Sequence, residues 1–186
     1  MEIKEFLYNN ISEADRSLLI DLISCVWKDE GGREIHLEEM NAMSFCALEN
    51  NRFIGYVGVV EWNINVQDEV FRMCGLSCVC THPLYRKRGL ATNLVRRATD
   101  WIKQSNVFDI GLFTCSHEHV SLYKQVGCWE IAPNLIIKES DREGAYQSDI
   151  QDLDVFKLII SRKAKICADY FENTTINLNF PSGQFI

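Results

Sequence analysis

The chain has 186 residues, of which 47% are hydrophobic and 24% charged, and its formal net charge is −7 at pH 7. This composition is typical of a globular protein and argues against a disordered chain, and no apolar run approaches the roughly 20 residues that span a bilayer. The length suits one domain, so we expect a single domain over residues 1–186. The first residues lack the basic-then-apolar pattern of a signal peptide, and the default prediction is a cytoplasmic protein.

The first half of the chain combines strand and helix signals. A strand is expected over residues 1–8, and the residues from Ser12 to Asp15 resemble a capping box at the start of a helix. Apolar residues then recur at helical spacing, at Ala14, Leu18, Leu22, Cys25 and Val26. A short helix is expected over 37–42. Strands are expected over 44–49, 52–62 and 69–80, the first two joined by a tight turn at Glu49-Asn50-Asn51.

The second half opens with a strongly amphipathic helix. Its apolar face consists of Ala91, Leu94, Val95, Ala98, Trp101 and Ile102. A strand over 109–115 follows, then a helix over 118–126 that ends at Gly127, and then strands over 129–138 and 154–161. This order of elements predicts an α+β domain with three α/β/α layers, built on one twisted, mixed sheet.

The cysteine pattern favours structural thiols over a metal site. No two of the eight cysteines form a C-x-x-C pair, and most lie in apolar contexts. We expect them to be reduced and buried in the core, and we expect no metal.

The charge is unevenly distributed. Residues 139–154 contain six acids and one base, whereas residues 71–103 contain seven bases and one acid. A single basic segment in an acidic protein suggests a local anion site rather than a nucleic-acid surface. On charge alone, a solvated helix face is the better explanation of this basic segment.

The most informative stretch runs from Leu76 to Ala91, where a strand ends and a helix begins at a basic, glycine-containing loop. The first amides of a helix have no intrahelical partner and lie at the positive end of its dipole, which suits a pyrophosphate. Gly89 and Ala91 remove side-chain bulk there. Three consecutive basic residues raise the local potential, namely Arg86, Lys87 and Arg88.

This stretch resembles the GNAT superfamily of N-acetyltransferases, whose [QR]-x-x-G-x-[GA] motif matches residues 86–91. The segment 109–115 looks like the next strand of that fold, and Leu122 to Cys128 looks like its Y-x-x-x-G-[FW] segment. The resemblance covers about residues 76–131 by motif, and the order of elements extends it over the chain.

The resemblance implies a mixed, mostly antiparallel sheet, splayed so that the pantetheine of acetyl-coenzyme A lies between two strands. The backbone of Cys78, Val79 and Cys80 would line the pantetheine, and the amides of Arg86, Lys87, Arg88, Gly89, Leu90 and Ala91 would hold the pyrophosphate. Tyr123 falls at the position of the acid that protonates the leaving thiolate, and a buried structural tyrosine is the alternative. The implied reaction is direct acetyl transfer from acetyl-coenzyme A to a primary amine.

The general base is left open. Relatives often carry a glutamate on the strand before the loop, but this region reads Leu76-Ser77-Cys78. Candidates elsewhere are Asp29, Glu30, Glu61, His82 and His117, and an amine with a pKa near 8 needs little base. Because a carboxylate is missing, a non-catalytic module that senses acyl-coenzyme A is an alternative.

The C-terminal half loosely resembles aminoglycoside 2′-N-acetyltransferases and the nodulation acyltransferase NodA. This resemblance implies a small-molecule amine acceptor such as an amino sugar, with Gln184 and Ile186 near it, although Gln184 stands where that family has an acid. Independently, the acidic segments at Asp29-Glu30, Glu38-Glu39 and 139–154 could bind a polycationic amino sugar or polyamine, and solvated acidic loops are the alternative. A strand that runs to Ile186 would form a wall of the acceptor site, and a frayed tail is the alternative. Protein and amino-acid amines are rival acceptors, no nucleic acid or membrane is expected as a partner, and a homodimer is left open.

Overall fold

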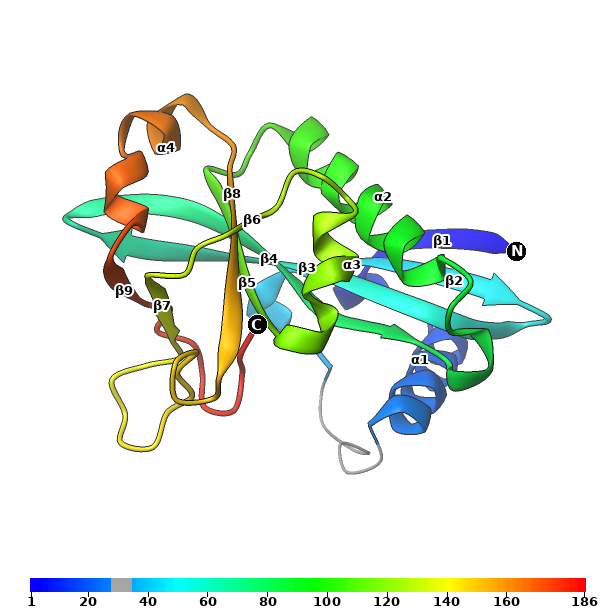
Figure 1. Cartoon of the computed structure of the whole chain (residues 1–186). Coiled ribbons are helices and arrows are strands. Elements are labelled where there is room, and N and C mark those ends of the chain that lie inside the picture. Colours follow the sequence, from blue (N-terminus) through cyan, green and yellow to red (C-terminus); the bar gives the residue numbers. More distant parts are fainter. Residues whose placement is uncertain (28–34) are drawn as a thin grey trace. The chain divides into compact units, whose positions relative to one another are not determined.

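The computed structural model describes residues 1–27 and 35–186, and the chain forms two compact units (Figure 1). The first unit comprises residues 1–60 and 76–101, and the second comprises 61–75 and 102–186. Two long strands, β3 (Arg52–Val66) and β4 (Glu69–Thr81), contribute residues to both units. A single domain over residues 1–186 stays a prediction.

The first unit is built on strands in the order β1-β2-β3-β4. Strand β1 (Glu2–Leu7) pairs antiparallel with β2 (Met43–Glu49), which pairs antiparallel with β3. Asn50 and Asn51 have φ values of 49° and 58°, as a two-residue hairpin turn requires, so the predicted turn is confirmed. Short 3₁₀ helices precede α1, β2 and the basic loop: η1 (Tyr8–Asn10), η2 (Glu38–Met40) and η3 (Pro83–Tyr85).

Two helices cover opposite faces of this sheet. Helix α1 (Glu13–Val26) begins at Ser12, whose hydroxyl accepts the N–H of Asp15, which confirms the predicted cap. Helix α2 (Leu90–Ser105) packs so closely on β3 that a β-carbon at Gly55 would lie 2.9 Å from Leu94. Figure 1 shows α1 and α2 on either side of the β1–β2–β3 strands, which gives the unit three layers.

The second unit contains a sheet in the order β4-β5-β8-β6 and a separate pair of strands. Strand β5 (Ile110–Ser116) is parallel to β4 at Met73↔Ile110 and Cys74↔Gly111, whereas β8 (Leu153–Ile159) pairs antiparallel with β5 and with β6 (Glu130–Ile131). Strands β7 (Leu135–Lys138) and β9 (Thr174–Asn177) form the parallel pair. The prediction of an α+β fold with a mixed, mostly antiparallel sheet is confirmed.

An aromatic cluster forms the core of the second unit. The ring of Phe113 on β5 contacts the rings of Tyr123, Trp129 and Phe156 at centroid distances of 4.7, 4.7 and 5.2 Å. A β-carbon at Gly111 would lie 2.6 Å from the Trp129 ring, so glycine is needed for this packing.

Three predicted elements of the second half need correction. The strand over 129–138 is divided into β6 and β7, because the turn at Ala132-Pro133-Asn134 sends the chain from one sheet to the other. The helix over 118–126 is shorter, with η4 (His117–His119) leading into α3 (Val120–Lys124), although Gly127 has the expected positive φ of 87°. The predicted C-terminal strand ends at Asn177, and two short helices precede it, α4 (Arg162–Ile166) and η5 (Ala168–Phe171).

The eight cysteines are free thiols, as predicted, but only half are buried. The buried ones are Cys46, Cys74, Cys80 and Cys115. Cys25 is exposed because it lies on the outer side of α1, so the expectation of a uniformly buried set is wrong. Among the described residues, no helix is both long and apolar enough to cross a membrane.

Candidate functional site

Strand β4 is irregular just before the basic loop. Cys78 has a φ of 52°, in the left-handed region, although it lies inside the strand. A residue in this conformation interrupts the regular ladder and turns its neighbouring peptide groups away from the adjacent strand. The backbone of Cys78, Val79 and Cys80 therefore has an altered direction at the place where the sequence predicts contact with an extended ligand.

The loop between η3 and α2 has the backbone of an anion cradle. Lys87 and Gly89 have φ values of 61° and 73°, whereas Arg88 between them is not in the left-handed region. Alternation of this kind turns successive N–H groups toward one side. The first intrahelical bond is donated by Asn93 to the carbonyl of Gly89, so the amides of Leu90, Ala91 and Thr92 precede the hydrogen-bonded ladder of α2.

Gly89 is suited to this loop for a conformational reason. Its φ of 73° is strained for residues with a β-carbon. A β-carbon built there would meet no protein atom within 4 Å, so the space over the loop is open. A phosphate could approach these amides without displacing protein atoms.

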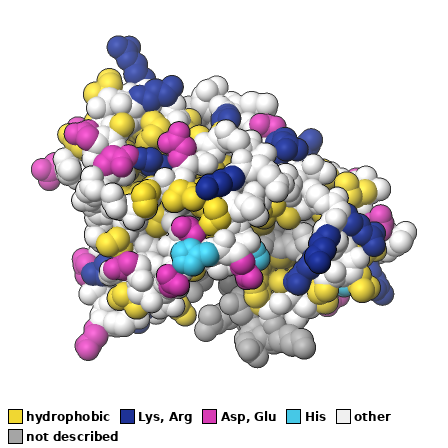
Figure 2. Space-filling view, in the orientation of Figure 1, with side chains coloured by type: hydrophobic (Ala, Val, Ile, Leu, Met, Phe, Trp, Pro, Cys, Tyr) yellow, Lys and Arg dark blue, Asp and Glu magenta, His cyan; other side chains and the backbone are white. Residues whose placement is uncertain are grey.

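The basic side chains around the loop are exposed. The guanidinium of Arg86 donates to the carbonyl of Thr81 at 3.4 Å, and that of Arg88 lies 5.1 Å from the centre of the Tyr85 ring. Figure 2 shows basic side chains gathered around the start of α2. The predicted positive potential is thus present at the helix N-terminus.

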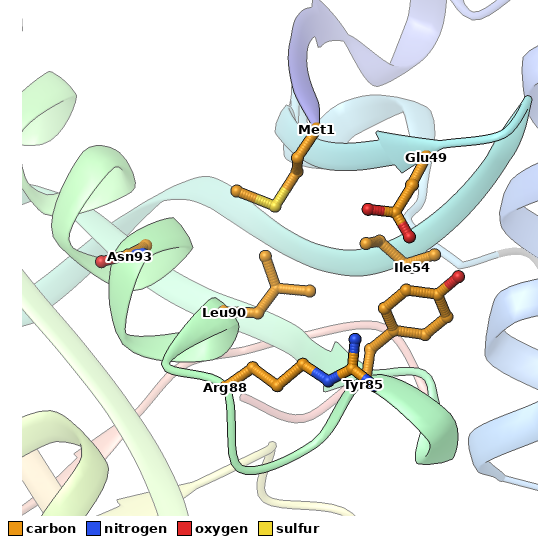
Figure 3. A pocket seen from close by; sticks show the side chains of 7 residues that line it. All are labelled: Met1, Glu49, Ile54, Tyr85, Arg88, Leu90 and Asn93. Carbon is orange, nitrogen blue, oxygen red and sulfur yellow. The ribbon is translucent and has the colours of Figure 1, made fainter.

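A cavity of about 90 Å³ adjoins the loop (Figure 3). Ile54 and Leu90 line it with apolar atoms, and Glu49 and Arg88 bring opposite charges to it. A hydrogen bond with Glu49 raises the pKa of the Tyr85 phenol above its ordinary value. Tyr85 therefore contacts both Glu49 and Arg88. The contact with the Tyr85 ring restrains the side chain of Arg88.

Thr81 is a candidate site residue that the sequence motifs did not single out. Its hydroxyl is buried and, among the described residues, lacks a hydrogen-bond partner. A buried unpaired hydroxyl is costly, and such a group often marks a ligand contact. Thr81 lies at the end of β4, between Cys80 and the basic loop. The sequence indicates this residue only in that a polar side chain, Thr81, directly follows the apolar residues of a strand.

Tyr123 lies in the aromatic core of the second unit. Its side chain is only 5% exposed, and it contacts Phe113 and Phe156 at 4.7 and 5.4 Å between ring centroids. Burial raises the pKa of the phenol well above its ordinary value, so the hydroxyl stays protonated near neutral pH. Within the described residues, no hydrogen bond uses that hydroxyl, which leaves it available as a donor.

The described candidates for a general base all have structural partners. Glu61 pairs with Arg72 at 2.7 Å, and the ring nitrogen of His82 accepts the N–H of Leu84 at 3.3 Å. His117 contacts two aspartates, Asp154 at 2.5 Å and Asp152 at 3.1 Å. Hydrogen bonds with Asp154 and Asp152 raise the pKa of His117, which favours its protonated form.

The residues predicted near the acceptor are only partly described. Asp29 and Glu30 lie outside the described residues. Gln184 is half-buried and Ile186 is buried in the second unit. The chain beyond β9 is irregular, yet the carbonyl of Ile186 accepts the N–H of Thr114 at 3.0 Å, so the segment is docked and not frayed.

The acidic segment 139–154 is less free than its composition suggests. Glu139 is fully buried and contacts Arg142, Asp141 pairs with Lys138 at 2.8 Å, and Asp152 and Asp154 hold His117. Most of these acidic side chains thus have partners within the protein, which weakens the argument that the segment binds a polycation.

The sequence of residues 8–132 matches the acetyltransferase (GNAT) domain family. Since this match spans most of the chain, the protein belongs to the GNAT acetyltransferase family, as predicted. None of the curated proteins matches the sequence.

Solved structures agree on the fold. One is an aminoglycoside 6′-N-acetyltransferase complexed with coenzyme A, with a TM-score of 0.58, 16% identity and coverage of 87% of this chain and 99% of that chain. A GNAT acetyltransferase from Streptococcus pneumoniae has a TM-score of 0.58 at 16% identity, over 86% and 100% of the two chains. The ribosomal-protein alanine N-acetyltransferase from Escherichia coli has a TM-score of 0.53 at 13% identity, over 86% and 95%. At these identities the likeness shows the fold alone.

Proposed function

We propose that the protein transfers an acetyl group from acetyl-coenzyme A directly to a primary amine. The observation that carries the proposal is the loop before α2. In this loop Gly89 has a positive φ and open space over it, and the amides that follow it precede the hydrogen-bonded ladder of α2. The exposed side chains of Arg86, Lys87 and Arg88 come directly before Gly89. These groups fit a pyrophosphate. The unpaired Thr81 hydroxyl and the altered backbone at Cys78 fit an extended amide-containing chain beside it.

In this reaction the amine nitrogen bonds to the thioester carbonyl carbon, the carbon–sulfur bond breaks, and a proton from the amine ends on the sulfur. Tyr123, which matches the family's acid, supports the departure of the thiolate. Because burial raises its pKa, the phenol is a weaker acid than a thiol. Its contribution is therefore a hydrogen bond to the developing negative charge, and the transferred proton originates from the amine.

Direct transfer is favoured over an acyl-enzyme intermediate. The thiol nearest the loop on β4, Cys80, is buried, and burial raises its pKa well above the ordinary value. A thiol with a raised pKa provides little thiolate, which is the nucleophilic form. Cys80 is thus a packing residue of the strand.

The proposed acceptor is the amine of an amino sugar. The loose resemblance of the C-terminal half to aminoglycoside acetyltransferases supports it, and one solved neighbour of the same fold is named for that class. Another neighbour is named for the alanine of a ribosomal protein, so a protein N-terminus is the second acceptor to test.

The test is thiol release from acetyl-coenzyme A with a panel of amines: an aminoglycoside, glucosamine, a polyamine and a peptide with N-terminal alanine. The proposal expects amine-dependent release that is fastest with an amino sugar and absent in Gly89→Glu. Cofactor binding in calorimetry without thiol release from any amine would instead favour the non-catalytic sensor. Release only with the peptide would reassign the acceptor.

A further inference from the structure

Glu139 is a fully buried carboxylate with no part in the reaction described above. It directly follows β7, and both of its oxygens are used. Oε2 accepts the N–H of Tyr146 at 3.0 Å and contacts the guanidinium of Arg142 at 3.2 Å. Oε1 accepts the N–H of Gly183 at 2.5 Å. A buried charge with this many donors organises the backbone around it.

The segment held by Glu139 is the chain beyond β9, which we call the strap (residues 178–186). The N–H groups of Leu178 and Phe180 donate to the carbonyls of Lys138 and Glu139 at 2.9 and 2.8 Å. The strap then turns, with Gln184 donating to the carbonyl of Pro181 and Gly183 at a φ of 81°, as the third residue of a type II turn requires. Glu139 thus anchors the strap by its main chain and its side chain.

The strap ends on the free edge of β5. Strands β4 and β5 pair only as far as Cys74↔Gly111 in the described ladder, whereas β5 continues to Ser116. The N–H and hydroxyl of Thr114 both donate to the carbonyl of Ile186, so they point away from β8 on the other edge. Figure 1 shows the C-terminus beside β5. The side chain of Ile186 is buried there.

Between these two anchors lies Gln184, whose position matters for recognition. Gly183 is fixed by Glu139 and Ile186 is fixed by Thr114, which leaves little freedom to the residues between them. The side-chain amide of Gln184 is half-buried and makes no hydrogen bond within the described residues. An amide held in this way can recognise a hydroxyl or an ammonium group.

We propose that Glu139 is a positioning residue for acceptor recognition: it holds the strap on the free edge of β5, and the strap presents Gln184 to the acceptor. This inference rests on the proposed acetyl transfer. Glu139 does not touch the acceptor. Glu139 acts through the N–H of Gly183. Replacing Glu139 would release the strap and leave the loop of residues 86–91 unchanged.

The test compares Glu139→Gln with wild type. Glutamine has the same shape, but its NH₂ group cannot accept the N–H that one carboxylate oxygen accepts. We expect faster hydrogen exchange in residues 178–186 and at the Thr114 amide, and an acceptor KM at least tenfold higher. The KM for acetyl-coenzyme A should change less than twofold. Asp141→Asn in the same loop, where Asp141 pairs at the surface with Lys138, is the matched control and should change neither.

A truncation lacking residues 182–186 separates this role from a general loss of stability. It should raise the acceptor KM at least tenfold by itself, and Glu139→Gln added to it should have no further effect. Thr114→Val, which removes the hydroxyl at the other anchor, should also raise the acceptor KM and replaces Glu139→Gln if that variant fails to fold. Hydrogen exchange needs no turnover, so it tests whether Glu139 holds the strap even if no amine proves to be an acceptor. Unchanged exchange in residues 178–186, or an equal effect of Glu139→Gln in the truncated protein, would overturn the proposal.

Discussion

The hydroxyl of Tyr56 lies 2.7 Å from Nε2 of His36, inside the first unit. The same hydroxyl is 3.0 Å from the hydroxyl of Ser44, and all three side chains are at most 1% exposed. A β-carbon at Gly58, on the same face of β3 as Tyr56, would lie 2.5 Å from Nε2 of His36. Gly58 therefore leaves the space that this buried polar group occupies.

Gly58→Ala is expected to destabilise the protein by about 1–3 kcal/mol, because overpacking forces buried neighbours off their preferred positions. Urea denaturation should give a lower midpoint for Gly58→Ala than for wild type, with an unchanged m-value. Gly55→Ala on the opposite face of β3 is the matched control, since its β-carbon would meet the flexible end of Leu94 at 2.9 Å. A loss at Gly55 equal to that at Gly58 would contradict this explanation.

Gly89→Glu is expected to abolish acetyl-coenzyme A binding. The substitution places a negative charge over the loop amides and imposes a side chain on a φ of 73°. Gly89→Gln carries the same bulk and strain without the charge, so it should bind more weakly than wild type but measurably. Gly89→Asn should bind best of the three, because asparagine tolerates positive φ. Calorimetric titration gives the affinities, and micromolar binding by a folded Gly89→Glu protein would refute the site.

Tyr123→Phe is expected to lower kcat by roughly 10²-fold, because it removes the hydrogen bond to the negative charge that develops on the leaving sulfur. The affinity for acetyl-coenzyme A should stay the same, since the lost interaction forms in the transition state. Stability should change by less than about 0.5 kcal/mol, because the ring contacts remain and the hydroxyl has no hydrogen bond within the described residues. An unchanged kcat would make Tyr123 a core residue or show that another step limits the rate.

His117 is expected to titrate above its ordinary pKa of 6.5, because Asp154 and Asp152 hydrogen-bond to its ring. A pKa raised by folding stabilises the protein fully below the unfolded value, and this stabilisation is lost as the pH rises through the folded value. The urea midpoint of wild type should therefore exceed that of His117→Asn more at pH 5.5 than at pH 9. NMR titration should show Asp154→Asn lowering the pKa of His117. A wild-type pKa of 6.5 or less would disprove the proposed pairing.

Much of the first unit and of the basic loop before α2 can be predicted from the sequence, because local interactions determine them. Ser12 caps α1 through an amide three residues away, and Asn50 and Asn51 supply the positive φ of their own turn. The same holds for Gly89, whose conformation and place before an amphipathic helix indicate an anion site without reference to the rest of the chain. These features depend on the residue itself and on neighbours within one helical turn.

Other features depend on residues that are distant in the sequence, and only the tertiary structure decides them. His117 is a base candidate by type, but aspartates 35 and 37 residues away hydrogen-bond to its ring and raise its pKa. The sequence around Glu139 reads as a solvated acidic loop, yet its carboxylate is buried because Gly183, 44 residues away, donates to it. Burial and pairing set the charge state and role of such groups, and both arise from contacts that no local pattern encodes.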